Sequence, residues 1–155
     1  MNPKILVPLD GSELAECVLP YVNWFNTLSD VKEITLIRVV EPLHLLGGIE
    51  SRFSPEEREH IEQDGINLAR DYLKQVAGQL KDTGVKITPV VLKGNPAEVI
   101  TNYADEHNLD LIIMATHGHS DVSRWLRGSV ADRVLNHARV PVLLVRPDFD
   151  KAEKD

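Results

Sequence analysis

The stretch Leu111-Ile112-Ile113-Met114-Ala115-Thr116-His117-Gly118 joins an apolar run to a polar loop, and Gly128-Ser129 follow after nine further residues. An unbroken apolar run such as Leu111–Ala115 is typical of a strand that is buried on both faces of a sheet. The residues after it place apolar side chains at helical spacing from Ser129 onward, namely Val130, Val134, Leu135 and Ala138. Glycine lets a backbone approach a phosphate closely, and the free N–H groups of a helix start attract anions. This stretch therefore predicts a strand, a loop with a phosphate site, and a helix.

Outward from this stretch, strand-like and helical patterns alternate along the chain. Apolar runs predict strands over 4–9, 33–40, 86–92, 111–115 and 141–145. The segments between them predict helices over 12–27, 54–80, 96–107 and 129–138. Alternation of this kind predicts an α/β fold, in which helices cover both faces of a parallel sheet.

Several element boundaries have local causes in the sequence. Ser54-Pro55-Glu56-Glu57 and Asn95-Pro96-Ala97-Glu98 both place a capping side chain before a proline at the first helical position. Pro20 lies inside the predicted first helix and is expected to kink it, because it cannot donate to the carbonyl of Glu16. Pro89 lies inside the third predicted strand, which indicates that this strand is at an edge of the sheet.

Composition predicts one domain over residues 1–147 and a charged, disordered tail over 148–155. The chain has 155 residues, of which 43% are hydrophobic, and this is enough to bury a sizeable core. A net charge of −7 argues against a nucleic-acid partner. Cys17 is the single cysteine, and we expect it to pack as an inert thiol. Without a signal-peptide pattern or an apolar run of membrane-spanning length, the expectation is a cytoplasmic protein with no membrane partner.

These motifs resemble those of the universal stress protein family. Its nucleotide-binding members carry Gly, two residues, Gly, nine residues, Gly and Ser or Thr, and the matching residues here are Ala115, Gly118, Gly128 and Ser129. The resemblance extends to Ile5–Ser12, to Gly94–Ala97 and to Val140–Val145, and it covers nearly the whole chain. The clear departure is Ala115, which replaces the first glycine of the motif.

The resemblance implies a doubly wound, Rossmann-like sheet of the adenine nucleotide alpha hydrolase-like type, with five strands in the order 3-2-1-4-5. Ligands of such sheets bind outside the carboxyl ends of the strands where the strand order reverses, here between the first and fourth strands. The implied ligand is ATP or AMP, with Mg²⁺ accompanying the nucleotide. Pro8 and Asp10 would border it, and the backbone at Val39 would meet the adenine. The other implied contacts lie in the phosphate loop and are Ala115, His117, Gly118, His119, Ser120, Gly128, Ser129 and Val130.

The chemistry of individual residues leaves two interpretations open at several of these positions. Asp10 can accept from ribose hydroxyls or hold the Mg²⁺ of a nucleotide, or it can cap the first helix, a role that Ser12 fills equally well. The hydroxyl of Ser129 can bind phosphate or cap the last helix. His117 and His119 form a His-x-His pair without an evident third metal ligand, and we interpret His119 as a phosphate contact. Arg124 and Arg127 either add charge to this loop or form a solvated basic face.

The sequence lacks the other common nucleotide motifs and shows no nucleophile, base and orienting acid in a recognisable order. We therefore expect no catalytic residues and at most slow, Mg²⁺-dependent ATP hydrolysis.

Two further segments bear on partners. The apolar, glycine-interrupted segment 41–50 is interpreted either as a lid over the ligand or as a contact surface. The last strand is an apolar edge, and the family dimerises through it, so a homodimer is expected through Val142 and Leu144. The leading hypothesis is a stress-response protein that binds an adenine nucleotide as a homodimer. The alternative is a nucleotide-independent regulator of the same fold that acts through protein partners, with the methyl group of Ala115 as the cause of lost binding.

Overall fold

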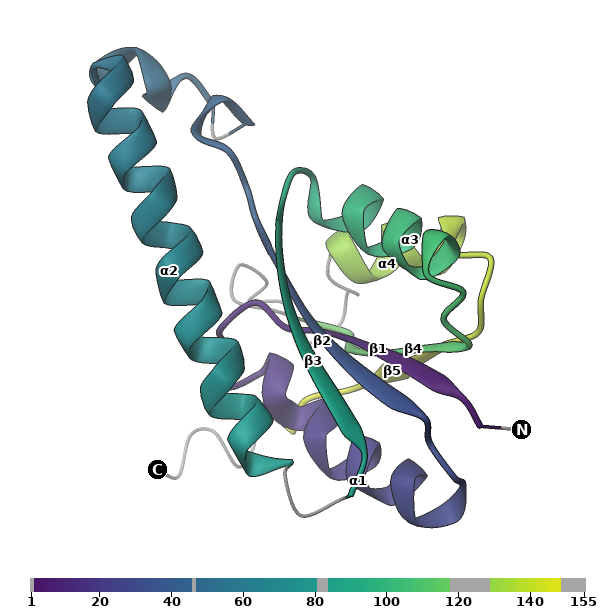
Figure 1. The fold of residues 1–155 in the computed structure, drawn as a ribbon. Coiled ribbons are helices and arrows are strands. Elements are labelled where there is room, and N and C mark those ends of the chain that lie inside the picture. Colours follow the sequence, from purple (N-terminus) through teal and green to yellow (C-terminus); the bar gives the residue numbers. More distant parts are fainter. Residues whose placement is uncertain (1, 46, 81–83, 118–128, 149–155) are drawn as a thin grey trace.

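Five parallel strands form one sheet in the order β3-β2-β1-β4-β5 (Figure 1), which confirms the expected strand order. The computed structural model describes residues 2–45, 47–80, 84–117 and 129–148. The strands are β1 (Lys4–Pro8), β2 (Glu33–Val40), β3 (Lys86–Lys93), β4 (Leu111–Ala115) and β5 (Val142–Val145). Pro89 lies in the edge strand β3, where a missing N–H group is tolerated, as predicted.

Helices cover both faces of this sheet, with α1 and α2 on one side and α3 and α4 on the other (Figure 1). The α-helices are α1 (Leu19–Leu28), α2 (Pro55–Gln79), α3 (Pro96–Glu106) and α4 (Ser129–His137). Three short 3-10 helices are η1 (Ala15–Val18), η2 (Leu43–Leu45) and η3 (Ile49–Arg52). Within the described ranges, no helix is long and apolar enough to cross a membrane.

The core consists of two apolar clusters, one on each face of the sheet. Alternate residues of a strand point to opposite faces, so Ile113 joins the cluster under α1 and α2, while Ile112 joins the cluster under α3 and α4. Both side chains are fully buried. This two-sided burial explains why the central strands read as unbroken apolar runs.

The first helix differs from the expected single, kinked helix over 12–27. A 3-10 turn, η1, precedes α1, and Pro20 lies in the first turn of α1. Pro20 has no N–H to donate to the carbonyl of Glu16. That carbonyl accepts from the N–H of Leu19 instead. A proline in a first helical turn costs no hydrogen bond, so the chain starts a new helix at this point and is not bent within one.

The two predicted helix starts are confirmed. Ser54 and Glu57 form a reciprocal capping box, in which the Ser54 hydroxyl accepts from the Glu57 N–H at 3.2 Å and the Glu57 carboxylate accepts from the Ser54 N–H at 2.7 Å. The side chain of Asn95 caps α3 by accepting from the N–H of Glu98 at 3.3 Å.

Two side chains near the core can be compared with the sequence-based predictions. The buried face of α4 is formed by Ala131 and Val134, whereas Leu135, predicted on the apolar face, is 37% exposed. Cys17 is half-buried against the core, and this burial raises the pKa of its thiol to about 11. A thiol with so high a pKa stays protonated at neutral pH, as expected for a packed cysteine.

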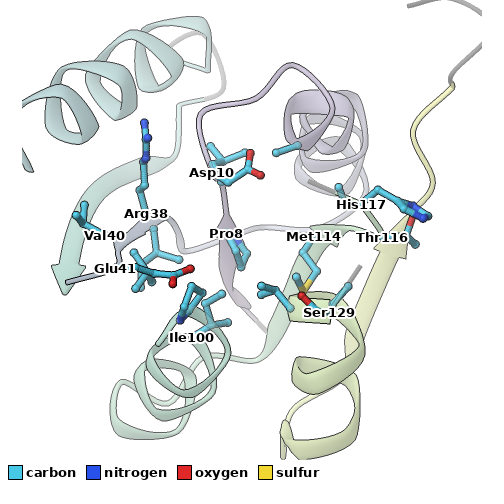
Figure 2. A pocket seen from close by; sticks show the side chains of 18 of the residues that line it. Pro8, Asp10, Arg38, Val40, Glu41, Ile100, Met114, Thr116, His117 and Ser129 are labelled. Atoms are coloured by element: carbon cyan, nitrogen blue, oxygen red, sulfur yellow. The ribbon is translucent and has the colours of Figure 1, made fainter. Parts of the chain in front are cut away.

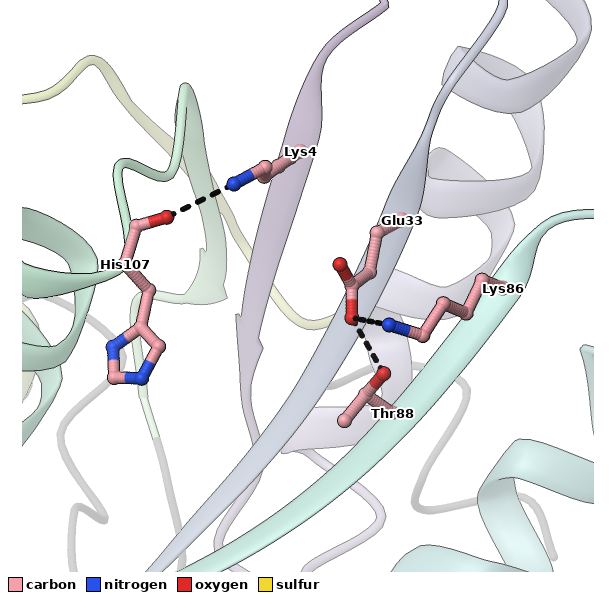
Figure 3. A network of polar contacts seen from close by, with 5 residues as sticks. All are labelled: Lys4, Glu33, Lys86, Thr88 and His107. Carbon is pink, nitrogen blue, oxygen red and sulfur yellow. Dashed lines mark hydrogen bonds and ion pairs between the residues drawn. The ribbon is translucent and has the colours of Figure 1, made fainter.

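A polar network lies at the opposite end of the sheet from the carboxyl ends of the strands (Figure 3). Glu33 accepts from the Thr88 hydroxyl at 2.6 Å and pairs with the Lys86 ammonium at 3.0 Å. Nearby, the ammonium of Lys4 donates to the carbonyl of His107 at 3.1 Å. The hydrogen bond from Thr88, assisted by Lys86 and opposed by desolvation, holds the pKa of Glu33 below its ordinary value.

Glu33→Gln is expected to lower the free energy of unfolding by about 1 kcal/mol at neutral pH, because charge-assisted hydrogen bonds are lost. A carboxylate with a lowered pKa stabilises the fold above its unfolded pKa, and this contribution disappears as pH falls through the folded pKa. The difference between the two proteins should therefore shrink as pH falls below the ordinary pKa of a glutamate carboxyl. Urea denaturation across this pH range measures it. The exposed Glu59→Gln removes the same charge, and an equal loss in that control would contradict the assignment.

Candidate functional site

The strands β1 and β4 separate at their carboxyl ends, where the strand order reverses. β1 pairs with β2 along its whole length, from Lys4 to Pro8. It pairs with β4 only at Ile5 with Leu111 and at Leu6 with Ile112. Beyond these positions the chain after β1 continues toward β2, through a hydrogen bond from the Leu9 N–H to the Ile37 carbonyl at 2.9 Å. The chain after β4 continues toward β5 in the same way, through Thr116. The divergence opens a crevice of the kind that binds ligands in doubly wound sheets.

A cavity of about 630 Å³ occupies this crevice (Figure 2). A volume of this size suits a ligand with several functional groups. Its lining comes from β1, β2 and β4 toward their carboxyl ends, from the residues that follow these strands, and from η1, α2, α3 and α4. The lining residues are Pro8, Leu9, Asp10, Ala15, Ile37, Arg38, Val39, Val40, Glu41, Gly65, Pro96, Ile100, Met114, Ala115, Thr116, His117, Ser129, Val130 and Ala131.

The structure gathers seven of the sequence-predicted site residues around this one cavity. They come from parts of the chain that are more than a hundred residues apart, and they are Pro8, Asp10, Val39, Ala115, His117, Ser129 and Val130. The other predicted contacts lie outside the described residues, as do the two arginines of the loop; these are Gly118, His119, Ser120, Gly128, Arg124 and Arg127.

Asp10 forms a tight turn directly after β1. Its carboxylate accepts from both the N–H and the hydroxyl of Ser12, and the N–H bond is 2.9 Å long. The Ser12 oxygen in turn accepts from the N–H of Ala15 at 3.2 Å, at the start of η1. Ser12 thus contacts the start of η1, whereas the cap position of α1 is Val18, which makes no side-chain cap hydrogen bond. Asp10 also lines the cavity, so this turn lies at the cavity wall.

Ser129 is the first residue of α4 and lines the cavity. A capping side chain normally belongs to the residue before the first helical one. The residue before Ser129 lies outside the described part of the chain, so the ligand interpretation and the capping interpretation of Ser129 both stay open. Val130 and Ala131, the next two residues of α4, also line the cavity.

His117 is buried, with 4% of its surface exposed, and its Nδ1 lies 2.8 Å from the Thr116 hydroxyl. Figure 2 shows its ring beside Thr116 and directed away from Asp10. Among the described residues, no group of three or more His, Cys, Asp or Glu side chains is placed to hold a metal ion. His119, the other member of the His-x-His pair, lies outside the described residues.

Sequence reasoning missed several parts of the cavity wall. Arg38 brings charge from β2, and Ile100 brings an apolar side chain from α3. Gly65 lies on α2, where an added Cβ would lie 3.6 Å from the Val40 side chain. Glu41 also lines the cavity; it directly follows β2 and begins the segment 41–50, which was interpreted from the sequence as a lid or a contact surface. The contribution of α2 had no comparable signal, because it depends on how the helix packs over β2.

The segment that begins at Glu41 was expected to be a lid or a contact surface. Glu41 itself lines the cavity, and the Leu43 N–H donates to the Glu62 carboxylate of α2 at 3.3 Å. The ammonium of Lys93 pairs with the same carboxylate, so Glu62 connects this segment to the end of β3. Leu46, in the middle of the segment, lies outside the described residues.

The fold agrees with comparisons to known proteins. Residues 1–146 match the universal stress protein family. The chain belongs to that family. Universal stress protein MJ0577 of Methanocaldococcus jannaschii is 32% identical over 156 residues, a match that covers 94% of this chain and 96% of the relative. The solved structure of MJ0577 superposes with a TM-score of 0.83 at 30% identity and covers 96% of this chain and 98% of that one.

Two more distant universal stress proteins share the fold and have a ligand in their structures. One from Arabidopsis thaliana was solved with AMP bound; it is 20% identical, has a TM-score of 0.66, and the match covers 96% of this chain and 94% of that one. Another was solved in complex with cAMP; it is 20% identical, has a TM-score of 0.65, and the match covers 95% of this chain and 98% of that one.

Proposed function

We propose that this universal stress protein binds an adenine nucleotide, ATP or AMP, in the cavity between β1 and β4, and that it acts as a homodimer in the stress response. The observation that supports this most directly is the separation of β1 from β4 beyond Leu6 and Ile112, which opens a cavity at the reversal point of the sheet. Ligand sites of doubly wound folds occur at this position.

The cavity wall offers three kinds of surface that suit the three parts of a nucleotide. Apolar side chains from β2 and α3, including Val39 and Ile100, suit the flat face of a base. The carboxylate of Asp10 suits the donor hydroxyls of a ribose. The first turn of α4, from Ser129, suits a phosphate because its backbone N–H groups and helix dipole favour negative charge.

The AMP and cAMP bound by the two distant family members support the same ligand class. For this chain, ATP as the ligand, Mg²⁺ as its companion and at most slow hydrolysis are parts of the proposal. Asp10 is the residue that we assign to ribose or to the Mg²⁺ of the nucleotide. We assign no catalytic residue.

A second candidate function is a regulator that acts through protein partners without a nucleotide. Ala115 favours it, because this residue lines the cavity where the family motif has glycine, and only 8% of its surface is exposed. An extra methyl group in a tight site costs about 1–3 kcal/mol through overpacking, which weakens binding by roughly 5- to 150-fold.

The test is to denature freshly purified protein, identify released nucleotides by chromatography and mass, and titrate the emptied protein with AMP and ATP by calorimetry, with and without Mg²⁺. Saturable binding of one nucleotide per chain, with a dissociation constant of about 10 µM or tighter, is expected. Phosphate release measured in the same samples should be slow and should require Mg²⁺.

Ala115→Gly separates the two candidate functions. If the wild-type protein binds neither nucleotide and the glycine variant binds AMP, the regulator is favoured and Ala115 is the cause. If neither protein binds a nucleotide, the proposed ligand class is wrong.

A further inference from the structure

Arg38 brings a cation to the edge of the cavity but does not point into its middle. It lies in β2, is partly buried, and is flanked by Ile37 and Val39 on the strand. Figure 2 shows its side chain directed away from Glu41 and Val40, past the loop that carries Asp10 and toward α2. The side chain of Arg38 therefore does not point toward a ligand in the middle of the cavity.

The guanidinium group of Arg38 packs against the backbone of Gly11. A Cβ atom added to Gly11 would lie 2.7 Å from Nη1, 3.0 Å from Cζ and 3.1 Å from Nη2 of Arg38. Three guanidinium atoms at such similar distances show that the group covers the Cα of Gly11 where a side chain would otherwise stand. Gly11 also has a φ of +88°, in the left-handed region that favours glycine. The positive φ therefore favours glycine by itself, and a Cβ atom at this position would displace the end of the Arg38 side chain.

A second contact fixes the position of the guanidinium. Its Cζ lies 5.4 Å from the centroid of the Tyr72 ring on α2, within the range of a cation–π interaction. Burial raises the pKa of Tyr72. The carboxylates of Glu16 and Asp10 raise it further, whereas the guanidinium of Arg38 lowers it. Among the described residues, the charged groups that act on Tyr72 are the carboxylates of Glu16 and Asp10 and the guanidinium of Arg38.

We infer that Arg38 is a positioning residue for the ligand site: it holds the turn of Asp10, Gly11 and Ser12 so that the Asp10 carboxylate faces the ribose. The contact of Asp10 with a ribose rests on the proposed function. The packing of Arg38 against the turn rests on the contacts of Arg38 described above. Tyr72 restricts the guanidinium on the α2 side, and the guanidinium restricts Gly11. Asp10 is the next residue along the chain, so its orientation depends on this packing.

The first test compares the affinities for AMP and 2′-deoxy-AMP, measured by calorimetry, in the wild type, Arg38→Met and Arg38→Lys. Methionine keeps an unbranched chain but removes the charge and the planar group, whereas lysine keeps the charge alone. The wild type should prefer AMP over 2′-deoxy-AMP about 5-fold or more, because Asp10 accepts from the ribose hydroxyls. Both variants should lose about 5- to 10-fold in AMP affinity, with a much smaller loss for 2′-deoxy-AMP.

The ratio of the two affinities distinguishes positioning from general destabilisation, because partial unfolding would weaken both ligands equally. Arg70→Met, at an exposed position of α2, is the matched control and should keep the wild-type ratio. Equal losses for both nucleotides in Arg38→Met, or a lysine variant with the wild-type ratio, would overturn the inference.

The second test uses the ligand-free protein. Urea midpoints are measured for Gly11→Ala, Arg38→Met and the double variant. Gly11→Ala displaces the guanidinium, so the second substitution should add little, and the shift of the double variant should be clearly smaller than the sum of the single shifts. Additive shifts would overturn the role of Arg38 in the turn. A wild-type protein that binds no AMP would instead overturn the proposed function, while this cycle still decides whether Arg38 holds the turn.

Discussion

Asp10→Asn is expected to weaken AMP binding by roughly 10- to 100-fold, because a hydrogen bond to a charged acceptor contributes about 1.5–3 kcal/mol. Asparagine keeps one oxygen that can accept from the N–H and hydroxyl of Ser12, so the turn after β1 is retained. It removes the negative charge and replaces the second acceptor with a donor. The substitution therefore separates the ligand role of Asp10 from its role in the turn. Calorimetric titration with AMP measures the effect.

The affinity for 2′-deoxy-AMP should fall less than that for AMP if Asp10 accepts from the ribose. Asp30→Asn, at an exposed position before β2, removes the same charge away from the cavity and should leave both affinities unchanged. Binding by Asp10→Asn at the wild-type strength would mean that Asp10 serves the turn alone. The ribose would then have to meet another part of the cavity wall.

The fold was predictable because its strongest determinants are local. The central strands have both faces covered, and their apolar runs, such as Leu111–Ala115, show this without reference to any other part of the chain. Ser54 marked a helix start because its capping hydrogen bonds lie within three residues, and Pro89 marked an edge strand because proline has no N–H to donate to a neighbouring strand. Pro20 was misread because a proline inside a helical pattern can either kink a helix or begin one. Here it begins one, and the N–H of Leu19 donates the hydrogen bond to the carbonyl of Glu16 that Pro20 cannot donate.

The candidate site was predictable in its position along the chain but not in its shape. The reversal of strand order places the ends of β1 and β4 together, and this order was implied by the resemblance to the universal stress protein family. The width of the crevice depends on how soon β1 and β4 stop pairing, which no local pattern encodes. For the same reason the sequence did not indicate that Arg38 reaches Gly11 and Tyr72. Those contacts join β2, α2 and the turn after β1, and they exist only once all three are packed.

Val142→Lys is expected to convert the proposed homodimer to a monomer. β5 is an edge strand of the sheet, and among the described residues its pairing partner is β4, with Val142 opposite Ile112. Val142 is partly buried against the core cluster under α3 and α4, so part of its surface remains for a second subunit. A lysine at a two-fold interface would face another lysine or an apolar surface, and like charges brought together in an interface cost several kcal/mol. Light scattering after size-exclusion chromatography should show the mass fall from two chains to one.

Val90→Lys provides the matched control, because it makes the same change on the opposite edge strand. Val90 is also partly buried, packs against the same core cluster, and lies on β3 opposite Ile37 of β2. The two substitutions should destabilise the subunit to a similar extent, as judged by urea denaturation at low protein concentration. Only the one on β5 should change the mass, because the proposed interface is on that edge. A dimer that survives Val142→Lys, or one that is lost equally in Val90→Lys, would place the interface elsewhere on the protein.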